Sequence, residues 1–314
     1  MAYHIAVDSC TDMTAAMKKD EHITLVPLTL NVGEDKIIDD ETFNQAEFLR
    51  KVAECPEAPS SACPSPDAYM QAYGYNNEDA YAITLSSELS GSYNSAKLGA
   101  DLLKEEYPDK KIHVFNSRSA SAGQTLILMK LQECLEAGKA FSEVVSEVEQ
   151  YIEEQATLFV LESLETLRKN GRLSGLKATL VNVLNIKPVM GSTPEGTIQQ
   201  LDMGRGMKKA LMKMVEQIGK TVIHPTDKYL MISHCNCLKR AEWLKVEIEK
   251  KYAFKGIVIV DTAGVATMYA NDGGIIVAYS GRRLILKADF WDYESNDYQN
   301  PGNRLLYFIC SLFK

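Results

Sequence analysis

The chain has 314 residues, of which 46% are hydrophobic and 24% are charged, and its formal net charge is −8 at pH 7. This length suits two domains of ordinary globular composition, and the negative charge argues against nucleic acid or an anionic membrane surface as a partner, since both select basic surfaces. No apolar run approaches the roughly 18 residues of a membrane helix, and the first residues lack the pattern of a signal peptide, so we expect a cytoplasmic protein.

The first 125 residues repeat one pattern three times: a short apolar strand, a loop rich in hydroxyl side chains, and a helix. The predicted strands are residues 4–7, 80–85 and 112–115, and the predicted helices begin at Met13, Asn94 and Gln124. In a parallel sheet such loops gather at the carboxyl ends of the strands, where ligands of open α/β sheets bind. Backbone N–H groups at helix starts favour negative charge, and hydroxyls add neutral donors. The loops therefore predict a site for a small anionic group.

The pattern changes near residue 155. Residues 141–154 are predicted to form an amphipathic helix, because their apolar side chains recur at helical spacing. After this helix, strands that can pair as hairpins alternate with helices, which is typical of an α+β domain with a partly antiparallel sheet. The predicted strands are residues 157–161, 186–190, 197–203, 228–233, 256–261 and 274–279, and the predicted helices begin at Leu164, Met207 and Leu238.

The sequence therefore predicts an α/β fold of two domains. Residues 1–155 form an α/β/α domain with a parallel sheet and serine-rich ligand loops, and residues 156–280 form an α+β domain with a mixed sheet. Residues 281–314 follow the last clear strand and contain many aromatic side chains. This C-terminal extension could cap the second domain or form an appendage.

Motifs that would name an enzyme are missing from the sequence. There is no phosphate-binding loop, no dinucleotide fingerprint after a strand and no nucleophile elbow. None of the five histidines stands in a motif that marks a catalytic base, although a loop serine could meet a base supplied from elsewhere in the fold. These absences favour binding without turnover, with catalysis by a loop serine as the alternative.

The seven cysteines are scattered along the chain, which in a cytosolic protein indicates free thiols. The one cluster of metal-binding residue types is His234-Cys235-Asn236-Cys237, and no second pair of ligands at zinc spacing accompanies it. We therefore expect neither a metal nor an organic cofactor.

Several segments, in a fixed order, resemble motifs of the DegV family of bacterial fatty-acid-binding proteins. The strongest is Ser86–Ala96, in which Leu89-Ser90-Gly91-Ser92-Tyr93 stands against the family's Leu-Ser-Gly-Thr-Tyr. The other segments are Asp8–Asp12, Ser61–Pro66, Asn116–Gly123, Leu164–Ser174, Lys187-Pro188, and Arg205 before Lys208–Ala210. The resemblance spans roughly residues 3–279.

This resemblance implies a ligand and a mode of action. In the family a fatty acid lies between the two domains, with its carboxylate in the loops and its acyl chain in an apolar tunnel. The family's proteins present that fatty acid to a partner kinase, which phosphorylates the carboxylate, so the binding protein is not itself the catalyst. On this basis we expect a cytoplasmic carrier of a long-chain fatty acid without a cofactor.

The resemblance also assigns residues to the head group of the ligand. Ser61 stands where the family uses a threonine hydroxyl on the carboxylate, and Ser90, Gly91 and Ser92 stand in the segment that supplies a hydroxyl and backbone N–H groups. Hydrogen bonds to a charged acceptor contribute roughly 1.5–3 kcal/mol each, and the acyl chain contributes about 0.8 kcal/mol per buried CH₂. Three other loop serines are interpreted as helix caps or turn residues, namely Ser9, Ser65 and Ser95.

One segment departs from the family pattern. Where the family has His-x-Gly-Pro-Gly before a strand, with the histidine on the carboxylate, residues 269–274 of this chain read Tyr-Ala-Asn-Asp-Gly-Gly. Ala270 falls at the histidine position, and a shift of one residue places Asn271 there, which can donate a hydrogen bond but carries no charge. We therefore predict Asn271 as a further ligand-binding residue.

Two arginines are candidates for contact with a partner protein. Arg172 lies at a predicted turn and could instead make a structural or inter-domain contact. Arg205 precedes a helix that carries Lys208, Lys209 and Lys213. This basic patch could dock a kinase or be an ordinary solvated helix face.

Two rival functions stay open at the level of the sequence. One is an acyl or phosphoryl transferase or hydrolase that uses a loop serine, and the other is a regulatory protein whose bound lipid only reports lipid status. The length and saturation of the acyl chain and the oligomeric state leave no signal, because tunnel residues would be ordinary apolar side chains.

Overall fold

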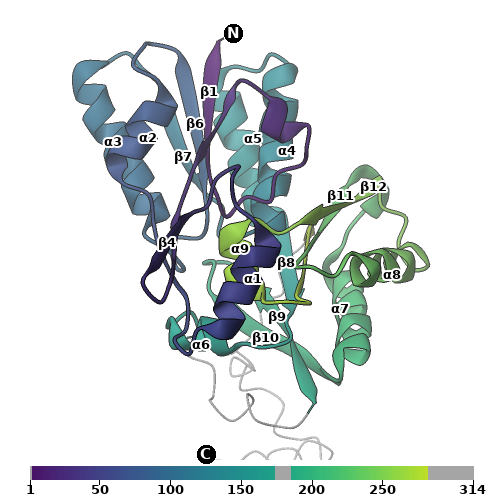
Figure 1. The fold of residues 1–314 in the computed structure, drawn as a ribbon. Helices are drawn as coiled ribbons and strands as arrows, with labels where there is room; N and C mark the ends of the chain where they lie inside the picture. The colour runs from purple at the N-terminus through teal and green to yellow at the C-terminus, as the bar shows by residue number, and fades with distance from the viewer. Residues whose placement is uncertain (1, 174–184, 282–314) are drawn as a thin grey trace, which may run out of the picture. The chain divides into compact units, whose positions relative to one another are not determined.

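The computed structural model describes residues 2–173 and 185–281, which form a four-stranded sheet A, a three-stranded sheet B and a six-stranded sheet C (Figure 1). The strands are β1 (Tyr3–Asp8), β2 (Ile23–Val26), β3 (Thr29–Val32), β4 (Asp35–Ile38), β5 (Ser60–Ala62), β6 (Asp79–Thr84), β7 (Ile112–Asn116), β8 (Gln155–Val160), β9 (Ile186–Ser192), β10 (Ile198–Arg205), β11 (Tyr229–His234), β12 (Gly256–Asp261) and β13 (Ile275–Ser280). The α-helices are α1 (Gln45–Glu54), α2 (Pro66–Tyr73), α3 (Ser92–Glu106), α4 (Ala122–Glu136), α5 (Phe141–Glu154), α6 (Glu165–Lys169), α7 (Met207–Thr221), α8 (Leu238–Glu249) and α9 (Gly264–Ala270), and two short 3₁₀ helices are η1 (Met17–Lys19) and η3 (Pro225–Asp227).

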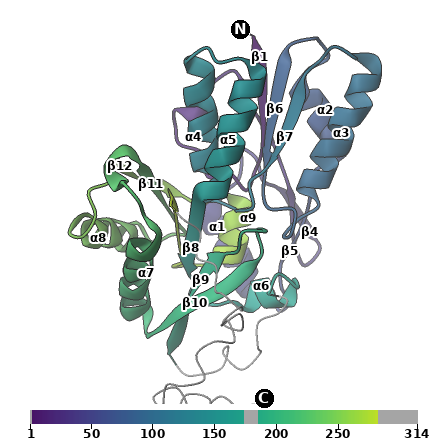
Figure 2. The same ribbon diagram turned by 180° about the vertical axis from the view of Figure 1, so that it is seen from behind.

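Sheet A is fully parallel, with the strand order β2-β1-β6-β7. Its strands alternate between the two faces, because successive side chains of a strand point to opposite sides. Ile5 and Val7 pack with α4 and α5, whereas Ala6 packs with α2 and α3. Figures 1 and 2 show these helix pairs on opposite faces of the sheet. The predicted parallel sheet with helices on both faces is confirmed.

Sheet C is mixed, with the strand order β10-β9-β8-β13-β11-β12 and one parallel pair, β11 with β12. Leu158 and Val160 of β8 pack with α7 and α8 on one face. Phe159 and Leu161 face the other side, where they pack near α4 and α9. The predicted α+β arrangement, including the hairpin of β9 and β10, is confirmed.

Helix α4 joins the two cores. Its residues Ile127 and Leu131 pack against sheet A, and its residues Ala122 and Leu126 pack against the inner face of sheet C. This helix is buried along much of its length, because it separates two sheets instead of covering one. The carboxyl ends of sheet A and the inner face of sheet C are therefore held near each other.

The helix predicted from Met13 is wrong. The chain there makes only the 3₁₀ helix η1 and then enters β2, which pairs in parallel with β1. Two residues that would start such a helix are instead buried in a polar network, because Thr11 Oγ1 accepts a hydrogen bond from Gln124 and Asp12 Oδ1 accepts one from Ala263. Of the predicted C-terminal extension, all but Gly281 lies outside the described residues, as does Ser174.

Candidate functional site

A cavity lies between the carboxyl ends of sheet A and the inner face of sheet C. Its walls enclose about 850 Å³ of empty space, counting the part that is open to solvent. The loops after β1, β6 and β7 form one side of this cavity, and strands of sheet C with α9 form the other.

Most of the cavity lining is apolar. The apolar residues come from both halves of the chain and include Cys10, Leu28, Leu85, Leu89, Ala120, Phe159, Leu161, Leu167, Ile198, Val265, Ala266, Ala270 and Ile276. Such a wall suits a hydrocarbon chain, because the burial of apolar surface is favourable and the interaction is not directional.

Hydroxyl groups and a guanidinium interrupt the apolar wall. Ser61 Oγ lies 3.5 Å from the Tyr269 hydroxyl, and both residues line the cavity. Ser90 lines it from the turn that starts α3, where its Oγ accepts a hydrogen bond from Ser92 N at 3.2 Å. The guanidinium of Arg172 is attached to the same turn, because its Nε donates to Leu89 O at 3.1 Å. Four donors from four segments thus line one cavity.

The electrostatics of the lining favour an anion. Among the described residues that line the cavity, the charged side chains are Arg118 and Arg172, and no carboxylate is present. Arg118 is paired with Glu153 at 2.5 Å. Within the described ranges Arg172 has no carboxylate partner and donates to the carbonyls of Leu89 and Asn170. A guanidinium without a counter-charge is suited to a carboxylate or a phosphate.

Asp8 organises the loops that carry these donors. Its carboxylate accepts hydrogen bonds from Leu85 N at 2.7 Å, Ser92 Oγ at 2.7 Å and Gln124 Nε2 at 2.8 Å. Burial raises the pKa of Asp8, while these hydrogen bonds lower it. One buried carboxylate thus ties the loops after β1 and β6 to the start of α4.

The structure brings together two of the five residues that the sequence assigns to the ligand. Ser61 and Ser90 line the cavity, whereas Gly91, Ser92 and Asn271 are not among the lining residues. The hydroxyl of Ser92 is buried and bonds to Asp8 and to the Tyr69 hydroxyl. Ser92 therefore supports the loop from behind the cavity wall.

Asn271 ends α9 in a left-handed conformation, with φ of +57°. Its Oδ1 accepts a hydrogen bond from Thr166 Oγ1 at 3.3 Å, and its Nδ2 donates to Tyr269 O at 3.1 Å. Ala270 lines the cavity in its place, and Tyr269, which sequence reasoning missed, supplies a hydroxyl beside it. A shift of the family motif by one residue in the other direction would have pointed to Tyr269.

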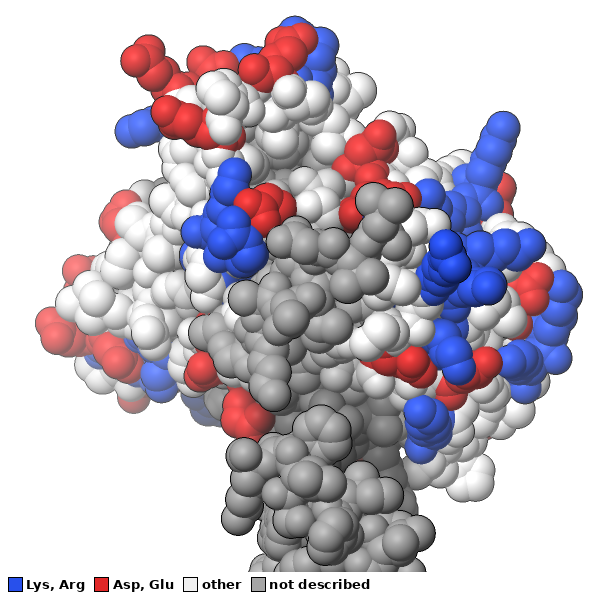
Figure 3. Space-filling view, turned by 90° about the horizontal axis from the view of Figure 1, so that it is seen from below, with Lys and Arg blue, Asp and Glu red and all other residues white. Residues whose placement is uncertain are grey.

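The basic patch predicted near Arg205 lies away from the cavity lining. Arg205, Lys208 and Lys209 are exposed at the junction of β10 and α7, whereas Lys213 pairs with Glu216 at 2.9 Å. Figure 3 shows Lys and Arg side chains gathered on the side of the molecule that carries α7 and α8, with acidic side chains among them.

Over residues 2–173 and 185–281, no group of three or more His, Cys, Asp or Glu side chains is arranged to hold a metal ion. His234 of the predicted cluster contacts Asp261 at 3.4 Å and accepts a hydrogen bond from Cys237 N. No helix in the same ranges combines the length and the apolar character needed to cross a bilayer.

Comparison with known proteins identifies the family. A family model described as "Uncharacterised protein, DegV family" matches residues 2–280. The chain belongs to the DegV family. A DegV domain-containing protein of Streptococcus pyogenes serotype M18 is 32% identical over 281 residues, which cover 89% of this chain and 99% of that relative. The resemblance inferred from the loop motifs is thereby confirmed.

Solved structures of DegV proteins share the fold. A DegV family protein from Ruminococcus gnavus, refined with vaccenic acid, is 52% identical and superposes with a TM-score of 0.85 over 88% of this chain and 99% of that one. The Streptococcus pneumoniae Fatty Acid Kinase (Fak) B3 protein, loaded with linoleic acid, is 32% identical, with a TM-score of 0.83 over 89% of this chain and 99% of that one. Both of these DegV proteins were solved with a fatty acid.

Proposed function

We propose that this DegV protein binds a long-chain fatty acid in the cavity between sheet A and sheet C. The observation that carries the proposal is the combination of an apolar wall with a guanidinium that has no carboxylate partner among the described residues, Arg172. A fatty acid has the matching combination of a hydrocarbon chain and one negative charge. The two solved relatives that hold vaccenic and linoleic acid support the same ligand class.

The carboxylate is assigned to the hydroxyl-bearing part of the cavity. Ser61, Ser90 and Tyr269 offer neutral donors there, and Arg172 offers charge. Gly91, Ser92 and Asn271, which the sequence also assigns to the ligand, do not line the cavity, and we assign them to the turn and to the end of α9 that carry those donors. Each hydrogen bond to the carboxylate contributes roughly 1.5–3 kcal/mol.

The acyl chain is assigned to the apolar wall formed by residues such as Leu161, Leu167 and Ile276. Burial of each CH₂ contributes about 0.8 kcal/mol, so the chain supplies most of the affinity and the head group supplies orientation. This division suits a carrier, because the reactive end of the ligand is held at a fixed place whatever the chain length.

Presentation of the bound fatty acid to a partner kinase completes the proposal. The name of the Fatty Acid Kinase (Fak) B3 relative supports such a partner. The carrier would do no chemistry on the ligand, and the exposed basic patch of Arg205, Lys208 and Lys209 is the proposed docking surface. A lipid sensor differs from a carrier in one respect, because only the carrier's fatty acid is consumed when the kinase and ATP are added.

The test compares two ligands that differ only in the head group. The full chain, stripped of lipid, is titrated with a long-chain fatty acid and with the alcohol of the same chain length. We expect one fatty acid per chain and an affinity at least about tenfold higher than for the alcohol, since one charge-assisted hydrogen bond is worth that factor.

Equal affinities for acid and alcohol would contradict the assignment of the carboxylate to Arg172 and the hydroxyls. The absence of binding for both would contradict the assignment of the cavity to a hydrocarbon chain. Turnover of an acyl or phosphoryl ester that disappears in Ser90→Ala would favour the rival enzyme.

A further inference from the structure

Helix α9 forms part of the cavity wall, and its first turn meets the N-terminal loops. It follows β12 directly, and four of its residues line the cavity: Val265, Ala266, Tyr269 and Ala270. A movement of α9 would therefore change both the apolar wall and the hydroxyl of Tyr269. What holds this short helix in place matters for the ligand site.

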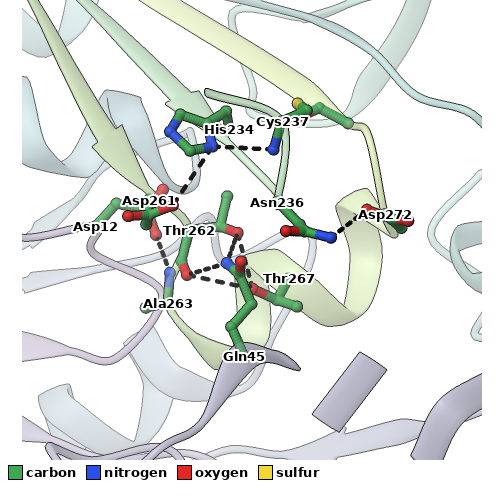
Figure 4. Close-up of polar contacts among 11 residues, drawn as sticks. Asp12, Gln45, His234, Asn236, Cys237, Asp261, Thr262, Ala263, Thr267 and Asp272 are labelled. Carbon is green, nitrogen blue, oxygen red and sulfur yellow. Dashed lines mark hydrogen bonds and ion pairs between the residues drawn. The ribbon is translucent and has the colours of Figure 1, made fainter. Parts of the chain in front are cut away.

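Two aspartates from the N-terminal half accept hydrogen bonds from three successive backbone N–H groups at the start of α9. Ala263 N donates to Asp12 Oδ1 at 2.7 Å (Figure 4). Gly264 N donates to Asp39 Oδ1 at 2.7 Å, and Val265 N donates to Asp39 Oδ2 at 2.8 Å. The first N–H groups of a helix have no partner inside the helix, so these carboxylates satisfy donors that would otherwise be unpaired.

Two further features tie the same turn to the N-terminal half. Gln45 of α1 donates its Nε2 to Thr262 O at 3.0 Å and to Thr267 Oγ1 at 3.2 Å (Figure 4). A Cβ atom at Gly264 would lie only 2.4 Å from Asp39 Oδ1. The absence of a side chain at Gly264 is therefore what lets the helix approach the carboxylate.

Neither aspartate has a cationic partner in the described ranges. Asp12 and Asp39 are 1% and 2% exposed, and no Lys, Arg or His of residues 2–173 and 185–281 forms an ion pair with them. Charge-assisted hydrogen bonds favour the contact, while burial of two carboxylates without a cation opposes it. These two opposing contributions make the strength of the contact depend on the ionisation of the carboxylates.

We propose that Asp12 and Asp39 are positioning residues of the ligand site, which hold the first turn of α9 and thereby control how readily the cavity opens for entry and release of the ligand. The identity of that ligand rests on the proposed function. The contact with α9 itself does not depend on it.

Because the two aspartates can ionise, the opening of their contact with α9 should depend on pH in a direction that can be worked out. The titratable groups that face one another here are Asp8, Cys10, Asp12 and Asp39. The other groups that face Asp12 are the hydroxyls of Ser121 and Ser233 and the N–H of Ala263. Those that face Asp39 are the hydroxyl of Ser9 and two N–H groups of α9. Burial raises the pKa of both Asp12 and Asp39 to about 6. When the contact opens and water reaches the two carboxylates, both pKa values fall again. The ionised forms that prevail above pH 6 therefore favour opening, and the protonated forms that prevail below pH 6 favour the closed contact.

Hydrogen exchange of the full chain without ligand tests the contact directly. The variants are Asp39→Asn, which replaces one of two acceptors by a donor, and Gly264→Ala, which crowds the same contact from the helix. Asp40→Asn is the matched control, because Asp40 accepts from Thr42 N at 2.9 Å and does not contact α9. We expect both variants to speed the exchange of the α9 amides about tenfold, as loss of one such hydrogen bond implies, with sheet A and Asp40→Asn unchanged.

The release rate of a fluorescent fatty acid gives the second readout, measured from about pH 5 to about pH 8. We expect release from the native chain to slow several-fold as the pH falls through 6, and this dependence to weaken in Asp12→Asn and Asp39→Asn. The carboxyl group of the fluorescent fatty acid also titrates, but it does so in the same way with every variant. The comparison with Asp40→Asn therefore isolates the two aspartates.

Equal α9 exchange in Asp39→Asn and Asp40→Asn would overturn the proposal. Faster exchange throughout the chain would also overturn it, because the aspartates would then have a general structural role. If the native chain binds no fatty acid at all, the proposed function fails, and the α9 exchange without ligand still decides whether the aspartates hold the helix.

Discussion

The serines of the loops differ in whether the hydroxyl already has a protein partner or can turn toward a ligand. Ser92 lies in the motif that resembles the family most closely, yet its hydroxyl donates to Asp8 at 2.7 Å. Ser61 and Tyr269 line the cavity, and their hydroxyls meet at 3.5 Å, a weak contact that a better acceptor would replace. Their donors are therefore free to turn toward a carboxylate.

Removal of either free hydroxyl should weaken head-group binding without unfolding the chain. We expect Ser61→Ala and Tyr269→Phe each to lower the affinity for a long-chain fatty acid about tenfold, since each loses one hydrogen bond to a charged group. Affinity for the matched fatty alcohol should change by less. Titration of the two variants with both ligands measures the difference.

Tyr75→Phe is the control for this pair, because Tyr75 is 49% exposed and does not line the cavity. It should bind both ligands as the native chain does. If Ser61→Ala and Tyr269→Phe also behave like the native chain, the carboxylate lies elsewhere in the cavity.

At the scale of elements, long segments with a clear period were predictable and short ones were not. The helix predicted over residues 141–154 has the same bounds as α5, and the hairpin of β9 and β10 was predicted from its turn. The strands β2 to β5 have three or four residues each, too few to show a period. Helix α1 was missed although it has an apolar face and an N-cap at Asn44.

The candidate site was predictable in its loops but not in its long-range contacts. Ser90 follows a strand whose pattern is clear, Ser61 was found from the family motif, and both line the cavity. Helix α9 gives no signal, because six of its seven residues are buried and so it shows no polar face. Asp39 lies 225 residues before Gly264 in the chain. A contact between residues so far apart cannot be predicted from a single sequence.

The aspartates that contact the start of α9 should also make the free energy of unfolding depend on pH. Burial raises the pKa of Asp39 from 3.8 to about 6, so the folded chain holds this proton more tightly than the unfolded chain. The resulting stabilisation is fully present below about pH 4 and is lost as the pH rises through about 6. It amounts to on the order of 3 kcal/mol at most, at 1.36 kcal/mol per pKa unit.

Urea unfolding of the native chain and of Asp39→Asn between about pH 4 and about pH 7 measures this effect. We expect the free energy of unfolding of the native chain to fall relative to that of the variant as the pH rises. Asp40→Asn should differ from the native chain by a nearly constant amount over this range, because hydrogen bonds from Thr42 lower the pKa of Asp40 and its titration therefore lies below this range. A native-to-Asp39→Asn difference that does not change with pH would contradict the raised pKa.

At the scale of the whole molecule, the cavity exists because residues of both sheet A and sheet C line it. Lining residues run along the sequence from Cys10 to Ile276, and α4 packs on both cores with Ile127 on one side and Leu126 on the other. The neutral donors come from the loop after β6, from β5 and from α9, and much of the apolar wall comes from sheet C and α9. Neither half alone forms this cavity.

The most direct test of this account is the identity of the molecule that the protein holds. The full chain is purified without denaturation, unfolded in organic solvent, and the released small molecules are analysed by mass spectrometry. We expect about one long-chain fatty acid per chain, because the cavity between sheets A and C is assigned one ligand. A protein that releases no fatty acid, and that also takes up none when it is added, would contradict the account.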